Sequence, residues 1–218
     1  MEVDIYETIK ERILFLEYKP AQLLNEKDIA KEFGLSRTPV REALKHLEWD
    51  QLVRVLPRSG TMVTEIQFEK MMYTFQVRFE IEELVGNLAA EHMQEEDAAR
   101  FEPLKQQCLG LMEEKDLHKL TDIDRSFRAI LFDAAQNPIL RQISDHLYNL
   151  TFRLWYITLP RGKWSDEVQA MYDEIDVTQK ACLQGNHPKI GSIRKEILIR
   201  HFTRIREKFL GMSPHVAV

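Results

Sequence analysis

The stretch from residue 25 to residue 64 constrains the fold of this 218-residue chain more than any other part of it. Two short segments with apolar residues at helical spacing flank Gly34, which suits the left-handed backbone at the end of a helix. Asn25 is placed to cap the first helix, and Ser36 to cap the second. Pro39 is tolerated in the first turn of the second helix, where N–H groups lack an intrahelical partner. The pattern predicts a helix-turn-helix.

The second helix has two distinct sides. A helical wheel places its apolar residues on one arc of roughly 100°, and these are Val40, Ala43, Leu44 and Leu47. The adjacent arc carries Arg37, Thr38, Arg41 and Lys45. We therefore expect one side to anchor the helix in a core and the other to offer donors to phosphates or guanine edges.

Two β-branched runs follow, at residues 53–55 and 62–64. Between them lies Pro57-Arg58-Ser59-Gly60, which is typical of a hairpin turn with a basic tip. A helix-turn-helix followed by such a hairpin predicts a winged helix.

The overall charge argues against a generally basic DNA-binding surface. The chain carries a net charge of −5, and residues 1–66 contain 10 Lys and Arg against 12 Asp and Glu. A protein that binds phosphates usually has a basic face. Locally the balance is reversed, because Arg37, Arg41, Lys45, Arg54 and Arg58 outnumber Glu42, Glu48 and Asp50. Binding would then depend on a focused patch.

Residues 5–64 resemble the DNA-binding domain of GntR-family bacterial transcription regulators, through the strings LNEKDIAKEFGLSRTPVREAL and PRSGTMV. One departure is Pro20-Ala21-Gln22, a loop where the family usually has Pro-Gly. As a bare pattern, the basic arc also fits a solvated helix face without a role in DNA binding. The resemblance implies DNA contacts at Lys27, Ser36, Arg37, Thr38, Arg41, Arg58 and Gly60.

From residue 67 onward, the periodicity is that of long helices. We expect them, after a leader helix at 4–16, at residues 68–93, 97–114, 118–135, 139–158, 164–184 and 188–210, with a turn at Gly185-Asn186. The predicted fold is mainly α. It has a winged helix-turn-helix domain over residues 1–66 and an all-α bundle of six to seven helices over residues 67–218.

The second domain resembles the FadR-like (FCD) branch of GntR regulators. The resemblance rests on the segments at 78–82 (RFEIE), 124–128 (DRSFR) and 137–140 (NPIL). It implies that the bundle binds small organic acids or acyl compounds and takes part in dimerisation. It also implies, for many members, a divalent metal held by one Asp and three His.

This chain departs from that metal pattern. Asp124 matches the Asp, but the three His positions fall on Arg128, on Ile175 and near Glu196. We therefore expect no metal and no other cofactor. A guanidinium can instead receive a carboxylate or phosphate, so the expected effector-binding residues are Arg78, Asp124, Arg128, Arg153 and Tyr156. The alternative is that Asp124 and Arg128 form only an intrahelical salt bridge, and that the aromatic residues around Arg153 are ordinary core.

These observations predict a DNA-binding transcription regulator, expected to be a repressor, that binds a near-palindromic operator as a homodimer and responds to a small anionic effector. The alternative is a ligand-independent dimer whose bundle only dimerises. An enzyme is not expected, because no Ser/His/Asp set, glycine-rich phosphate loop or HExxH motif is present. No apolar run predicts a membrane span. Cys108 and Cys182, without a CxxC motif, suggest the cytoplasm.

Overall fold

The computed structural model describes residues 4–184 and 189–211, in two compact units. Unit 1 contains the described residues up to Thr74 together with His146–Tyr156, and unit 2 contains Phe75–Asp145 and the described residues from Ile157 onward. The predicted turn at Gly185-Asn186 and the start of the last helix at residue 188 lie outside the described residues. None of the described helices is long and apolar enough to cross a bilayer.

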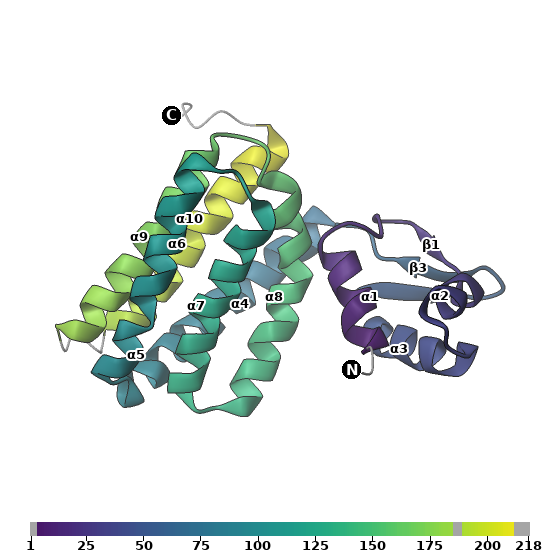
Figure 1. Cartoon of the computed structure of the whole chain (residues 1–218), viewed down its shortest axis with the longest axis horizontal. Coiled ribbons are helices and arrows are strands. Elements are labelled where there is room, and N and C mark those ends of the chain that lie inside the picture. Colours follow the sequence, from purple (N-terminus) through teal and green to yellow (C-terminus); the bar gives the residue numbers. More distant parts are fainter. Residues whose placement is uncertain (1–3, 185–188, 212–218) are drawn as a thin grey trace. The chain divides into compact units, whose positions relative to one another are not determined.

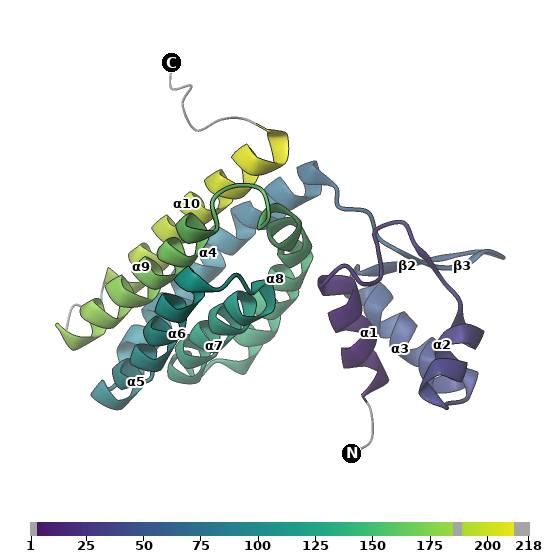
Figure 2. The ribbon, with the colours of Figure 1, turned by 45° about the horizontal axis from the view of Figure 1, so that its top comes forward.

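Unit 1 is a winged helix-turn-helix, as the sequence predicts. A small antiparallel sheet of order β1-β3-β2 lies along one side of three helices (Figures 1 and 2). The elements are α1 (Ile5–Leu14), β1 (Leu23–Leu24), α2 (Glu26–Phe33), α3 (Arg37–Trp49), β2 (Val53–Leu56) and β3 (Gly60–Val63). Strand β1 was not predicted, because two residues are too few to show an alternation.

The helix termini of unit 1 follow from local chemistry. The Asn25 side chain accepts a hydrogen bond of 2.9 Å from the backbone N–H of Lys27, and Gly34 ends α2 with φ of 65°. Ser36 occupies the N-cap position of α3, but its side chain makes no capping hydrogen bond. The prediction for Ser36 is therefore right in position and wrong in the role of its hydroxyl.

The core of unit 1 comes from the apolar arcs that the sequence shows. Ile9 and Ile13 of α1 are fully buried, as are Val40 and Leu47 of α3. Burial of side chains of this size stabilises the fold by roughly 1.5–3 kcal/mol each. The apolar side of α3 is therefore fixed in the core, and its opposite side faces outward.

Unit 2 is a helical bundle, to which α4 and α8 contribute only part of their lengths (Figures 1 and 2). Within the described residues, the bundle helices number seven: α4 (Phe68–His92), α5 (Glu95–Ala99), α6 (Phe101–Glu113), α7 (Leu117–Ala135), α8 (Pro138–Thr158), α9 (Trp164–Leu183) and α10 (Ile190–Leu210). The single helix predicted at 97–114 is in fact two. The Arg100 N–H donates to the Asp97 carbonyl at 3.1 Å, and this i to i−3 turn ends α5 before α6 begins.

Helices α4 and α10 touch backbone to backbone at two glycines. A Cβ added to Gly86 would lie 2.6 Å from the Gly191 Cα, and one on Gly191 would lie 2.6 Å from the Glu83 carbonyl oxygen. No larger residue fits at this crossing without moving a helix. The close approach brings α10 within reach of the acidic residues of α4.

A buried carboxylate lies near this crossing. Glu82 is 1% exposed and accepts hydrogen bonds from Arg128 Nη1 at 2.6 Å, Arg194 Nη2 at 2.8 Å and Ser144 Oγ at 2.8 Å. Burial alone would raise the pKa of the Glu82 carboxyl, but the charges of Arg128, Arg194 and Arg78 outweigh it and hold the pKa well below its usual range. Glu82 thereby connects four helices: α4, α7, α8 and α10.

Glu82→Gln is expected to destabilise the bundle by about 3–5 kcal/mol, because it removes the buried anion that Arg128 and Arg194 share. Chemical denaturation of the full chain measures this loss. The matched control is Glu80→Gln on the same helix, whose exposed ion pair with Lys195 is worth at most about 1 kcal/mol.

The same variant changes the pH dependence of stability. Because the folded-state pKa of Glu82 is depressed, its contribution is complete above the ordinary value of 4.5 and is lost as the pH falls below that value. Glu82→Gln should therefore lose less stability on acidification below pH 4.5 than the unchanged chain does. An equal loss in both proteins would contradict this role of Glu82.

Candidate DNA-binding face and effector site

The outward side of α3 carries a stripe of cationic residues. Arg37, Arg41 and Lys45 follow one another at i, i+4 and i+8, so they lie on one face of the helix. The side chains of Arg37 and Arg41 are 61% and 51% exposed. Their positions are fixed by the buried opposite side of α3, while their guanidinium groups stay accessible.

A carboxylate of the preceding helix contacts both arginines. Glu26, the first residue of α2, accepts hydrogen bonds from Arg37 Nη2 at 3.2 Å, Arg41 Nε at 3.3 Å and Arg41 Nη2 at 3.0 Å. The hydrogen bond from Arg41, followed by that from Arg37, holds the pKa of the Glu26 carboxyl below its ordinary value. Glu26 stays ionised and orients the two guanidinium groups side by side.

The other predicted contacts of the helix-turn-helix are also exposed. Lys27 lies in the first turn of α2, and Thr38 lies in the first turn of α3. The Ser36 hydroxyl, which makes no capping bond, remains able to hydrogen-bond an external group. With Arg37 and Arg41, these residues cluster where α2 and α3 begin.

The wing supplies the remaining two predicted residues. Arg58 lies in the turn between β2 and β3 with φ of 68°, and Gly60 begins β3 with φ of 104°. A side chain is strained at a φ of 104°, so the backbone favours glycine at position 60. Arg58 is exposed at the tip of the hairpin, which is visible in Figure 2. Both residues belong to unit 1 with the cluster on α2 and α3.

The five predicted effector residues are divided between the two units. Arg78, Asp124 and Arg128 lie in unit 2. There Arg128 donates to Glu82 and, through Nη2 at 3.0 Å, to the Ser144 hydroxyl, and Arg78 Nη2 lies 3.9 Å from Glu82 Oε1. These two guanidinium groups are therefore committed to an internal carboxylate. Asp124 is partly buried on α7, four residues before Arg128.

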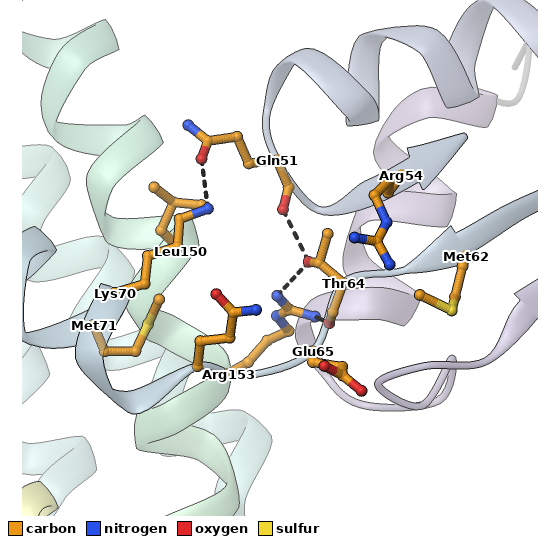
Figure 3. A pocket seen from close by; sticks show the side chains of 10 residues that line it. Gln51, Arg54, Met62, Thr64, Glu65, Lys70, Met71, Leu150 and Arg153 are labelled. Atoms are coloured by element: carbon orange, nitrogen blue, oxygen red, sulfur yellow. Dashed lines mark hydrogen bonds between the residues drawn. The ribbon is translucent and has the colours of Figure 1, made fainter. Parts of the chain in front are cut away.

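Arg153 and Tyr156 lie in unit 1, in the C-terminal third of α8. Arg153 donates from Nη1 to the Thr64 carbonyl at 2.7 Å and from Nη2 to the Thr64 hydroxyl at 2.9 Å (Figure 3). Tyr156 packs against Phe15 and Phe152, with ring centroids 5.2 and 5.9 Å apart. Tyr156 thus belongs to an aromatic cluster, while Arg153 directs its charge at the residue that follows β3.

The residues at the family's metal positions do not suit a divalent ion. Arg128 is a fixed cation, Ile175 is fully buried and apolar, and Glu196 is exposed beside Arg200. Within the ranges that the structure describes, no three His, Cys, Asp or Glu side chains are grouped so that they could hold a metal. Of the one Asp and three His that the resemblance implies as metal ligands, this chain has the Asp, which is Asp124.

Sequence reasoning missed the contacts or pocket positions of three charged residues, Glu26, Arg54 and Lys70. The role of Glu26 has no local signal in the sequence, because its contacts with Arg37 and Arg41 span 11 and 15 residues. Arg54 and Lys70 line one pocket of unit 1 together with Arg153. A signal for Arg54 was its basic side chain within a wing strand, but nothing local pairs it with Lys70.

Two family descriptions match this chain. Residues 2–63 match the bacterial regulatory proteins of the gntR family, and residues 73–175 match the FCD domain. A relative from Bacillus subtilis (strain 168), the uncharacterized HTH-type transcriptional regulator YdhC, is 27% identical over 154 residues, which are 68% of this chain and 66% of YdhC. The HTH-type transcriptional regulator LutR of the same organism is 25% identical over 89% of this chain and 94% of LutR.

Solved structures agree with the fold. The structure of McbR/YncC from E. coli superposes with a TM-score of 0.83 at 20% identity, over 94% of this chain and 96% of that one. A putative GntR transcriptional regulator from Rhodococcus sp. RHA1 gives a TM-score of 0.73 at 18% identity, over 96% of this chain and 97% of that one. The chain therefore belongs to the GntR family of bacterial regulatory proteins, as a DNA-binding transcription regulator that carries an FCD domain.

Proposed function

We propose that this regulator works in the cytoplasm, that it binds a near-palindromic operator as a homodimer and acts as a repressor, and that a small anionic effector sets its affinity for DNA. The observation that carries the DNA-binding part is the exposed stripe of Arg37 and Arg41, held side by side by Glu26. Bidentate hydrogen bonds from arginine to the N7 and O6 acceptors of guanine are the commonest specific contacts in the major groove.

The proposed docking follows from the two sides of α3. The N-terminal part of a recognition helix contacts base edges, and the DNA-contact residues of α3 lie in its first turn and a half. Lys27, Ser36 and Thr38 would reach the flanking phosphates, and Arg58 would contact DNA from the wing. Because unit 1 lacks a broad basic surface, one copy would bind weakly, and two copies on two half-sites would bind tightly.

An exposed apolar stripe on α4 supports the proposed homodimer. Val77 and Leu84 of unit 2 are 50% and 44% exposed, and their spacing of i and i+7 places them on one helix face. Exposed apolar residues that gather on one face mark interaction sites. A second copy of the chain is the partner that a near-palindromic operator requires.

A ligand-independent regulator is the second candidate. The observation that favours it is the closed pairing of Arg128 with Glu82 and Ser144, which leaves this guanidinium engaged without an effector. A thermal-shift screen with small carboxylates distinguishes the two candidates. Stabilisation by at least one of them supports the effector-controlled regulator, and no stabilisation supports the ligand-independent one.

Arg37→Ala and Arg41→Ala should each weaken operator binding by about 1–3 kcal/mol and relax base preference at one position of each half-site. Band shifts with an operator fragment at moderate salt measure this effect. Lys163→Ala, which removes an exposed cation of unit 2, is the control and should leave the affinity unchanged. Unchanged operator binding by both arginine variants would show that α3 is not part of the DNA interface.

Glu26→Gln should tighten binding to random DNA and lower the preference for operator over random DNA by about tenfold. The negative charge near the phosphates is lost, and so is the group that orients the arginines. Competition binding with both DNAs measures the ratio. Glu32→Gln is the matched control, since Glu32 lies on the same helix and pairs with Arg12 at 2.6 Å. A preserved preference in Glu26→Gln would show that Glu26 does not orient the arginines on DNA.

Val77→Glu should shift the protein from dimer to monomer, because it places a charge on the apolar stripe of α4. Sedimentation velocity at micromolar concentration reports the change. Gln76→Glu introduces the same charge at the adjacent exposed position, about 100° around the helix, and should stay dimeric. A Val77→Glu protein that sediments as the unchanged chain does would exclude this face.

A further inference from the structure

Arg153 is a buried cation with no carboxylate partner in the residues that the structure describes. It is 3% exposed, both of its terminal nitrogens donate to the neutral oxygens of Thr64, and its Nε makes no hydrogen bond. Burial lowers the pKa of Arg153 to about 10, so the group remains charged at neutral pH. A buried charge without a counter-ion costs several kcal/mol, which makes this position ready to receive an anion.

Two further cations share a pocket with Arg153. The pocket has a volume of about 220 Å³ and lies within unit 1. Figure 3 shows Lys70 and Arg54 on either side of the pair formed by Arg153 and Thr64. Glu65 is the pocket's single carboxylate, so three positive charges face one negative charge. Among the described residues, no carboxylate lies within ion-pair distance of any of the three cations.

Lys70 forms no ion pair with any carboxylate in the described part of the chain. Its Nζ donates to the Gln51 side-chain oxygen at 2.5 Å. Burial, followed by the charge of Arg153, lowers the pKa of Lys70. Lys70 lies in the first turn of α4, and the N-terminus of a helix adds partial positive charge. Each of these effects favours an anion in the pocket.

The remaining wall of the pocket limits the kind of anion. Met62, Met71 and Leu150 supply an apolar surface beside the cations. A cavity of about 220 Å³ has the volume of roughly seven water molecules. A short aliphatic chain would cover the apolar wall, whereas a phosphate ion would leave it exposed to water.

We propose that this pocket binds a small carboxylate with a short aliphatic body, whose carboxylate lies between Arg153, Lys70 and Arg54. This inference rests on the proposed effector control and assigns its site to unit 1 instead of to the Arg128 cluster. The ligand would contact Thr64, which directly follows wing strand β3, so binding would act on the base of the wing.

Isothermal titration calorimetry of the full chain with butyrate tests the proposal. Butyrate should bind, whereas 1-butanol and inorganic phosphate should not. Arg153→Gln and Lys70→Gln should each weaken butyrate binding by at least about tenfold, since each removes a charged hydrogen bond. Arg161→Gln, an exposed arginine of unit 2, is the control and should bind as the unchanged chain does.

If circular dichroism shows that Arg153→Gln does not fold, butyrate binding is tested with Lys70→Gln and with Arg54→Gln, which changes an exposed residue. Absence of butyrate binding, tighter binding of phosphate than of butyrate, or variants that bind as well as the unchanged chain would each overturn the proposal. A band shift distinguishes the proposed binding site from the proposed effector control. Butyrate binding that depends on Lys70 but leaves operator affinity unchanged would support the site and refute effector control.

Discussion

The organisation of the bundle depends on one buried carboxylate. Glu82 on α4 receives hydrogen bonds from α7, α8 and α10 through Arg128, Ser144 and Arg194. Bringing these charges out of water is unfavourable, and their direct pairing offsets that cost. The contact of α4 with α10 at Gly86 and Gly191 holds the two helices close enough for it. The four helices are therefore held in one arrangement by a polar centre as well as by their apolar core.

This pairing changes where regulation is to be sought. Arg128 lies where the family resemblance implies a metal ligand, but Glu82 already supplies its counter-ion. Arg153 presents the opposite case, a buried guanidinium whose hydrogen bonds within the described structure go to the neutral oxygens of Thr64. Of the three predicted effector arginines, Arg78 and Arg128 are thus paired with Glu82, and Arg153 is open to a ligand. The open one lies in the same unit as the DNA-binding helix.

Local chemistry made much of the fold predictable. Asn25, Gly34 and the apolar arc of α3 act through neighbours within one or two turns, so their roles follow from spacing alone. The pairing of Arg128 with Glu82 spans 46 residues and that of Arg153 with Thr64 spans 89. No local pattern specifies such contacts. The sequence therefore could not separate the effector residues of unit 1 from those of unit 2, nor show that Glu26 bridges the arginines of α3.

Selection of binding sites from a pool of random double-stranded DNA tests the central claim most directly, because binding by the protein alone decides which sequences are recovered. If two copies of α3 enter successive major grooves, the selected sequences should share two inverted half-sites whose centres lie about 10 base pairs, or a multiple of that, apart. Selection with Arg37→Ala should lose base preference at one position of each half-site. Recovery of unselected, random sequences by the unchanged protein would contradict the assignment of a sequence-specific DNA-binding regulator.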